Sequence, residues 1–215
     1  ALVLYAESGV PFEAKEIAAR KHYTGTRSLG SGEIWLFHIG GSAEGGGVQL
    51  NEKPNWQKDL GEPALSPDGR YLYYSQDTTP GTSFEYNKNG NGQIYQIFRR
   101  DLHEGKTRAF VSGPGGAIRP TPSPDGKYLA FVRRVRNQST LFLKDLSTGV
   151  ERAAWGGLER DLQESWSVYG VYPAFAWTPD SKQVVAWAQG KIWRIDSAKG
   201  TAAVVPFHVK DTREV

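Results

Sequence analysis

PSPDGKYLAFVRR, residues 122–134, has the pattern of a tight turn followed by a β-strand. A near copy, LSPDGRYLYYSQD, begins at Leu65, and a weaker copy, WTPDSKQVVAWAQ, begins at Trp177. A phrase that recurs at long and similar intervals indicates a repeated structural unit. The residues that flank each copy are therefore expected to belong to the repeated unit.

The turn itself occupies residues 66–69, 123–126 and 178–181. Proline pre-sets φ at the second turn position, aspartate suits the third, and glycine is favoured at the fourth. In the weakest copy serine stands in place of the glycine. The three segments are thus predicted to be the same β-turn.

Each turn joins the first two strands of a predicted four-strand unit. The first strand precedes the turn, the second follows it, and a third and a fourth are joined by another short turn. The first strands are predicted at 62–66, 119–123 and 172–177, and the third strands at 97–102, 141–146 and 191–196. The opening residues fit the same unit without its first strand, with the other three at 1–6, 33–39 and 47–51.

Four antiparallel strands per unit, arranged radially, make a β-propeller, in which repetition protects the strand edges. We therefore predict an all-β fold in which 215 residues form a single propeller region. Its blades are expected at approximately 1–55 (incomplete), 62–115, 119–158 and 172–207. Since propellers have four to eight blades, these roughly four blades are expected to be part of a larger ring; the alternative is a strand supplied from elsewhere.

Aromatic residues recur at one position of the third strands and are expected to fill the space between blades. They are Trp35, Phe98, Phe142 and Trp193.

Composition excludes several classes of function. The net charge is +3, and the longest basic stretch, RRVR at 133–136, is interpreted as a solvated edge rather than a nucleic-acid site. There is no cysteine, hence no disulfide or thiolate chemistry, and no apolar run long enough to span a membrane. No signal peptide is recognised. The absence of methionine indicates a fragment of a longer product, or missing residues.

Long connections are expected to gather on one face of the propeller, because the chain direction alternates from strand to strand. They are predicted at 6–32, 51–61, 75–96, 112–118, 133–139 and 156–171. Long loops in compact domains commonly carry function. This face is therefore the predicted site of a ligand or a partner domain.

Carboxylates, aromatic rings and an arginine in or beside these loops form the candidate polar pocket at the mouth of the central channel. The alternative is that they are solvated and pair with one another. The candidates are Trp56, Asp59, Asp77, Glu85, Tyr86, Arg119, Glu164 and Trp166.

No catalytic motif is present in the sequence. Gly-x-Ser-x-Gly and His-Glu-x-x-His do not occur, and the four histidines are scattered. NKNGNG at 87–92 lacks the carboxylates of a calcium loop. We predict no catalytic residue, no metal site and no cofactor within this chain.

The repeats resemble the WD-like Pro-Asp repeats of TolB-type β-propellers, well over 62–207 and partly over 1–51. Longer stretches, among them 16–37, 61–89, 113–134 and 170–182, resemble propellers that precede the barrel of bacterial amidohydrolases. That resemblance implies a hydrolase of C–N bonds with a divalent metal held by His-x-His in a separate catalytic domain. This chain has no His-x-His, so none of the family's catalytic residues carries over.

Three hypotheses follow from the resemblance. The chain is a non-catalytic propeller that shapes or gates an amidohydrolase-like active site, a stand-alone periplasmic module that binds a partner protein, or the substrate-filtering propeller of a prolyl-oligopeptidase-like peptidase. The expected partner is a catalytic domain of the same polypeptide or another protein. Nucleic-acid binding and a membrane span are not expected. The expected location is periplasmic or secreted, with the cytoplasm left open.

Overall fold

The computed structural model describes residues 2–7, 24–26, 33–38, 48–51, 60–82, 89, 91–159 and 175–210. Within these residues every regular element is a β-strand, and the strands form four sheets of four. No helix in the described part of the chain is long and apolar enough to cross a membrane. The predicted all-β fold of four-stranded blades is confirmed.

Each sheet is one blade and draws its strands from one continuous part of the chain. Blade 1 contains β1 (Leu2–Glu7), β2 (Thr24–Thr26), β3 (Glu33–His38) and β4 (Val48–Asn51). Blade 2 contains β5 (Leu60–Leu65), β6 (Tyr71–Asp77), β7 (Tyr95–Asp101) and β8 (Thr107–Val111). Blade 3 contains β9 (Ile118–Pro122), β10 (Tyr128–Val135), β11 (Gln138–Asp145) and β12 (Glu151–Trp155). Blade 4 contains β13 (Phe175–Trp177), β14 (Gln183–Ala188), β15 (Lys191–Asp196) and β16 (Ala202–Val205).

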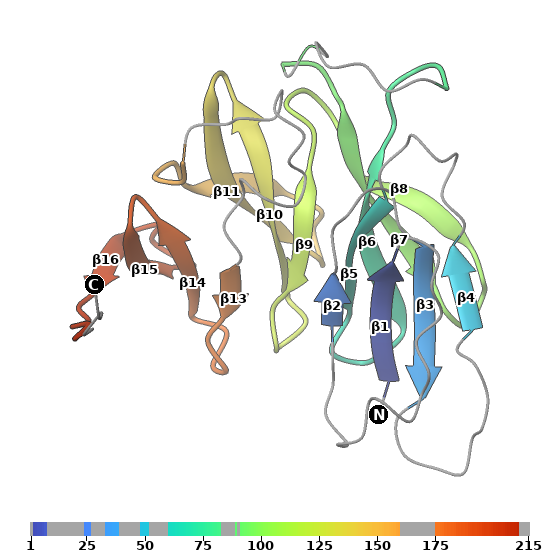
Figure 1. Ribbon diagram of the computed structural model, residues 1–215, viewed down its shortest axis with the longest axis horizontal. Coiled ribbons are helices and arrows are strands. Elements are labelled where there is room, and N and C mark those ends of the chain that lie inside the picture. The colour runs from blue at the N-terminus through green and yellow to red at the C-terminus, as the bar shows by residue number, and fades with distance from the viewer. Residues whose placement is uncertain are drawn as a thin grey trace, which may run out of the picture.

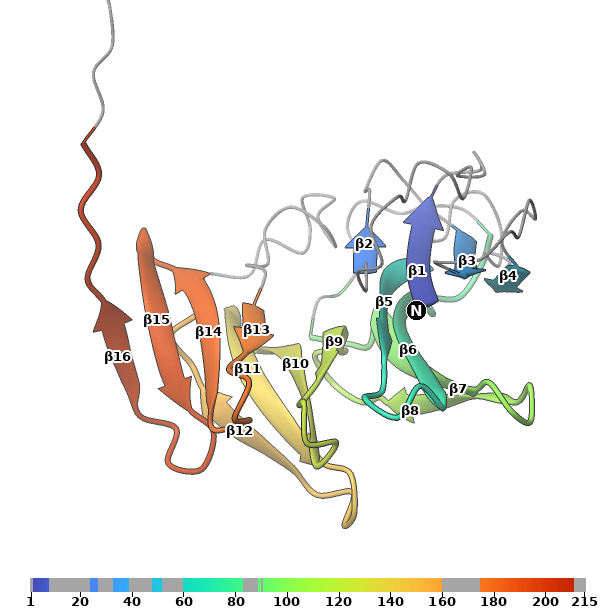
Figure 2. The ribbon, with the colours of Figure 1, turned by 90° about the horizontal axis from the view of Figure 1, so that it is seen from below.

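The four sheets stand side by side along an arc (Figures 1 and 2). In Figure 2 the first strands of blades 2 to 4, β5, β9 and β13, lie toward the concave side, and the fourth strands lie outermost. We call these first strands the inner strands, since they line the concave side.

Blade 1 departs from the expected three strands. Its inner position is occupied by β2, which comes after β1 in the chain and pairs with it in parallel, with Leu4 opposite Thr24. In the other blades the inner strand precedes the second strand and is antiparallel to it. The prediction of a missing strand was wrong because a later segment of the chain takes the vacant edge, which sequence alignment to the repeat could not reveal.

The repeated Pro-Asp turn is closed by its aspartate. In blade 3 the Ser123 hydroxyl donates to Asp125 Oδ1 at 2.6 Å, and the same oxygen accepts the Lys127 N–H at 3.1 Å. Ser123 Oγ also accepts the N–H of Tyr128 at 2.9 Å. Gly126 has φ +70°, in the left-handed region that glycine adopts at no steric cost. The same contacts recur in blades 2 and 4.

A second repeated turn joins the third and fourth strands, with the pattern Asp-x-x-x-Gly. In blade 3 Asp145 Oδ1 accepts the N–H groups of Ser147 and Thr148 at 2.8 and 2.9 Å. The Gly149 N–H donates to the Asp145 carbonyl at 2.8 Å. Leu146 N–H bonds the Lys127 carbonyl of the Pro-Asp turn. Both short turns therefore lie at one end of the blade, as predicted.

Neighbouring blades pack through alternate residues of their second strands. On β6, Leu72 and Tyr74 join Ile34 of blade 1 in one hydrophobic cluster. The residue between them, Tyr73, belongs instead to a cluster with Phe131 of blade 3. Because side chains of a strand point alternately to its two faces, each blade has one face toward the preceding blade and one toward the next.

Blades 3 and 4 repeat this arrangement. Ala130 and Val132 of β10 cluster with Val184 and Ala186 of β14. We call the face that carries Ala130 and Val132, and its equivalents, the forward face. In blades 2 and 3 the forward face is covered by the blade that follows in the chain.

The recurrent third-strand aromatics confirm their predicted packing where they are described. Phe98, Phe142 and Trp193 each lie against the cluster between two blades. Trp193 contacts Trp155 across the blade 3–blade 4 boundary, with ring centroids 5.3 Å apart. The side chain of Trp35 lies outside the described residues.

The prediction of a long connection at 133–139 was wrong. Val135 pairs with Gln138, so only two residues link β10 and β11. Arg136 takes φ +59° there, which closes the hairpin tightly. The basic stretch was misread because Arg133 is not a loop residue: its guanidinium donates to Glu151 Oε2 at 2.8 Å and its side chain is 14% exposed.

Candidate functional site

Two of the eight candidate residues, Asp77 and Arg119, lie in the described part of the structure. The other six lie outside the described residues: Trp56, Asp59, Glu85, Tyr86, Glu164 and Trp166. The structure therefore tests the predicted polar pocket only around the inner strands of blades 2 and 3.

Arg119 forms a buried polar cluster with Glu62 and Ser75. Glu62 Oε2 accepts the Ser75 hydroxyl at 2.6 Å and the Arg119 backbone N–H at 2.7 Å. The Arg119 guanidinium Nε lies 3.4 Å from Glu62 Oε1. The Glu62 side chain is 5% exposed and that of Arg119 is 17% exposed. The cluster thus ties inner strand β9 to β5 and β6 of the preceding blade.

Both charged members of the cluster have unusual backbone conformations. Glu62 has φ +57° and Arg119 has φ +56°, although each is a non-glycine residue followed by proline. The pairing register shifts at both places, between Gly61 and Ala64 on β5 and at the equivalent point of β9. Bulges of this kind re-aim a side chain, and left-handed non-glycine residues each cost on the order of 1–3 kcal/mol. The same local distortion in two adjacent blades brings the carboxylate and the guanidinium together.

Burial raises the pKa of Glu62 above 4.5, and the nearby Arg119 charge opposes this shift without cancelling it. The hydrogen bonds from Ser75 and from the Arg119 N–H act in the same direction as that charge. A carboxyl desolvated in this way holds its proton to a higher pH than an exposed glutamate.

Asp77 ends β6 two residues after Ser75. Its Oδ1 accepts the Thr79 N–H at 2.8 Å and the Thr79 hydroxyl at 2.6 Å. The residue is 2% exposed. Asp77 therefore shapes the exit from β6, a role the candidate pocket did not foresee.

The cluster is suited to positioning rather than to metal chemistry. Glu62 Oε2 already accepts donors from two strands, and in the described residues no group of three His, Cys, Asp or Glu side chains is placed to hold a metal ion. What it can do chemically is hold a proton at a buried carboxyl and fix the spacing of two inner strands.

Glu62 was missed as a partner of Arg119. The available signal was its position: Glu62-Pro63 and Arg119-Pro120 each begin four residues before the serine of the Pro-Asp turn. Equivalent positions in consecutive blades lie side by side in a propeller, so opposite charges there predict an ion pair between blades.

The comparisons with solved structures show the fold. TolB from Acinetobacter baumannii matches with 20% identity and a TM-score of 0.58, over 82% of this chain and 38% of TolB. A protein assigned as TolB from Agrobacterium tumefaciens matches with 16% identity and a TM-score of 0.52, over 81% of this chain and 56% of its own length. A puromycin-hydrolyzing peptidase of Mycobacterium tuberculosis matches with 14% identity and a TM-score of 0.53, over 85% of this chain and 30% of the peptidase.

No protein-family model and no curated protein matches the chain. The chain spans about two fifths to just over half the length of the two TolB structures that it matches. The same fold is indicated by the four-stranded blades in an arc, by the repeated Pro-Asp turns and by these similar solved structures. The chain has the fold of a TolB-like β-propeller.

Proposed function

We propose that this chain is the non-catalytic TolB-like propeller region of a larger amidohydrolase-like protein, where it shapes or gates access to a hydrolase domain. The observation that carries the larger-ring part of the proposal is the forward face of blade 4. The amidohydrolase part rests on the sequence resemblance.

The forward face of blade 4 carries an exposed apolar row. Trp187 of β14 is 54% exposed, whereas the equivalent residues, Ser75 of blade 2 and Val132 of blade 3, are each 1% exposed. In the antiparallel register Trp187 lies opposite Ile192, which lies opposite Val205, so an apolar row crosses three strands. We infer that a further four-stranded blade covers this row, because every other forward face with described side chains packs on the next blade.

The buried Glu62–Arg119 pair supports a shaping role on the concave side. It fixes two adjacent inner strands through a charge pair and a backbone hydrogen bond. A rigid inner wall suits a domain that positions or filters what reaches a neighbouring active site. The proposed partner is the catalytic domain of the same polypeptide, with any divalent metal bound there, and the proposed location is the periplasm or the cell exterior.

The deciding experiment is the intact mass of the polypeptide from its natural source, with peptide sequencing beyond Val215. The expected result is a mass well above 23.8 kDa and a His-x-His motif further along the chain. A downstream Gly-x-Ser-x-Gly would replace the proposal by the propeller of a peptidase. A mass near 23.8 kDa would replace it by a stand-alone module that binds a partner protein.

The forward face of blade 4 can be tested separately in the full-length natural protein. Trp187→Glu is expected to lower its melting temperature, because the charge would be buried without a partner. Val150→Glu is the matched control, since Val150 is also apolar and 62% exposed but lies at the short-turn end. Equal melting temperatures for the two variants would contradict coverage of this face by another blade.

A further inference from the structure

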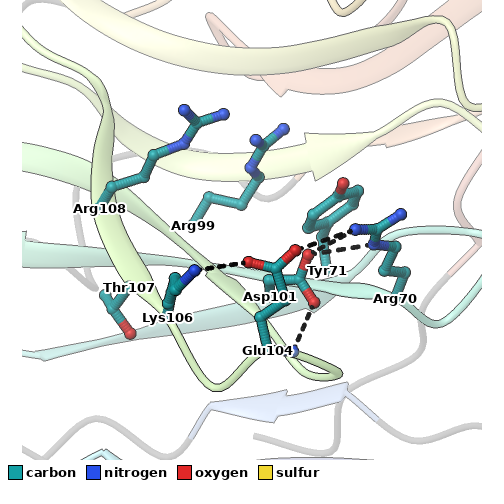
Figure 3. A pocket seen from close by; sticks show the side chains of 8 residues that line it. All are labelled: Arg70, Tyr71, Arg99, Asp101, Glu104, Lys106, Thr107 and Arg108. Atoms are coloured by element: carbon teal, nitrogen blue, oxygen red, sulfur yellow. Dashed lines mark hydrogen bonds and ion pairs between the residues drawn. The ribbon is translucent and has the colours of Figure 1, made fainter.

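Blade 2 carries a charged depression of about 490 Å³ at its short-turn end, opposite the end where the sequence placed the ligand site. Its volume lies in the range of small-molecule sites. Figure 3 shows around it side chains from Arg70 and the start of β6, from β7, from the turn after β7 and from β8. The charged residues that line it are Arg70, Arg99, Asp101, Glu104, Lys106 and Arg108.

Two of the four cations are matched by the two carboxylates. Arg70 donates to Asp101 Oδ2 through Nε at 3.0 Å and Nη2 at 2.9 Å. Lys106 Nζ lies 3.2 Å from Glu104 Oε2. These pairs account for all the negative charge that lines the depression.

The other two cations, Arg99 and Arg108, have no ion pair with any described carboxylate. They are directly opposite one another in the β7–β8 register. Like charges in that relation destabilise a sheet. In Figure 3 their side chains run side by side in the same direction. Within the described residues, the depression therefore presents two adjacent guanidinium groups whose positive charges no carboxylate pairs with.

Arg99 is held in place rather than left to sample solvent. Its guanidinium carbon lies 4.3 Å from the centroid of the Tyr71 ring and 4.4 Å from that of Phe110. Contacts of this kind with two aromatic rings are favourable for a cation. Burial raises the pKa of Tyr73, and the Arg99 charge and hydrogen bond oppose that shift, so Arg99 also contacts the Tyr73 hydroxyl. An ordered guanidinium loses little entropy when it binds an anion.

The repeat shows that the blade does not need this pair of arginines. The register places Leu143 opposite Arg152 at the equivalent position of blade 3, and Arg194 opposite Ala203 in blade 4. A single arginine in this pair of opposed positions is therefore compatible with the same strand pairing. Among these three blades the doubled arginine is specific to blade 2.

From this geometry we propose that the depression binds a small phosphate monoester through Arg99 and Arg108, with Lys106 at its edge. A carboxylate has only two oxygens, and in the same depression the Arg70 guanidinium engages one oxygen of Asp101, while the other accepts the N–H groups of His103 and Glu104. A phosphate dianion has three terminal oxygens, which match the donor forks of two guanidinium groups. The proposal is independent of the proposed function, since it concerns the opposite end of the blade from the channel loops.

The test is isothermal titration calorimetry, which measures the affinity of the chain for glycerol 2-phosphate at constant ionic strength. Arg108→Ala is expected to weaken binding about tenfold or more, because a charge-assisted bidentate contact is lost. Arg108→Lys keeps the charge without the donor fork, and its affinity is expected to lie between those of the unmodified chain and of Arg108→Ala. Arg194→Ala is the matched control, since Arg194 is the exposed equivalent of Arg99 in blade 4 and is expected to leave affinity unchanged.

Melting temperature in the absence of ligand provides a second measurement. Removal of one of two opposed cations is expected to raise it in Arg108→Ala while affinity falls, a combination that general damage to the fold does not produce. No binding by the unmodified chain, or equal affinity in Arg108→Ala and Arg194→Ala, would overturn the proposal.

Discussion

Aspartates at two repeated turns decide much of the local structure at the scale of single residues. Each Pro-Asp turn uses its carboxylate to accept a serine or threonine hydroxyl and a backbone N–H. In blades 2 to 4 the turn between the third and fourth strands uses a carboxylate to accept two successive N–H groups. The conspicuous Pro-Asp-Gly phrase is therefore a hydrogen-bonding device for closing a turn.

Asp125→Ala is expected to lower the free energy of unfolding by about 1 kcal/mol, because the Ser123 hydroxyl and the Lys127 N–H lose their acceptor. Glu104→Ala removes an exposed carboxylate whose contacts are surface ion pairs and is expected to change stability by less than about 0.5 kcal/mol. Denaturant unfolding measures both. Equal stability of the two variants would refute the role assigned to Asp125.

Gly126→Val is expected to cost about 1 kcal/mol or more, because Gly126 has φ +70° and valine is β-branched. A Cβ at Gly126 meets no atom within 4 Å, so the cost lies in the backbone conformation alone. Gly126→Asn is the control, since asparagine tolerates this region. If both variants melted like the unmodified chain, the turn assignment would fail.

Acid is expected to destabilise the chain through these aspartates. Hydrogen bonds from Ser147 and Thr148 lower the pKa of Asp145 from 3.8 to about 2. The pKa values of Asp68, Asp125 and Asp180 are also lowered, chiefly by the neighbouring hydroxyl. A lowered folded-state pKa contributes stability above 3.8 that is lost as pH falls toward the folded value. Thermal melts from pH 5 to pH 2, taken at constant ionic strength, test this loss.

The pKa of Glu62 is shifted in the opposite direction, so its contribution to stability changes with pH in the opposite sense. Burial raises its pKa above 4.5, so its favourable contribution is present below 4.5 and is lost as pH rises through the folded-state value. Glu62→Gln removes this titration, and the variant is expected to gain stability relative to the unmodified chain as pH rises above 4.5. A stability difference independent of pH would show that the carboxyl is not raised.

At the scale of elements, the segment between β8 and β9 sets how blade 3 follows blade 2. The Gly115 N–H donates to the Gly92 carbonyl at 2.9 Å, and the Gly115 carbonyl accepts the Arg134 N–H at 3.1 Å. A Cβ at Gly115 would lie 2.0 Å from the Arg134 carbonyl oxygen. The predicted long loop at 112–118 is thus pinned against β10 and leaves no room for a side chain.

Gly115→Ala is expected to destabilise the chain by on the order of 1–3 kcal/mol more than Gly113→Ala. Both glycines have positive φ, so both substitutions carry a backbone cost, but a Cβ at Gly113 meets no atom within 4 Å. The difference between the two variants in denaturant unfolding isolates the steric conflict. No difference would mean that β10 yields at this point without cost.

At the scale of the whole molecule, the short turns of blades 2 to 4 share one end of the blades, and the sequence predicts that the long connections share the other. Limited proteolysis tests this division. First cuts are expected within 75–96 or 6–32, the long connections of the sequence, and later cuts in the Pro-Asp turns, whose backbone groups are hydrogen-bonded. Mass spectrometry of the first fragments identifies the sites; initial cleavage at 67–69 or 124–126 would reverse the assignment.

The sequence by itself determined the repeat, the class of fold and the position of the turns, because proline, aspartate and glycine at fixed spacing act through local backbone preferences. It also determined that Phe98, Phe142 and Trp193 of the third strands lie between blades, since strand alternation follows from position alone. Only the tertiary structure decided that β2 occupies the inner edge of blade 1, that Glu62 reaches Arg119, and that Arg99 lies opposite Arg108. These depend on pairing between segments far apart in the chain, where register and bulges, rather than residue type, set which side chains meet.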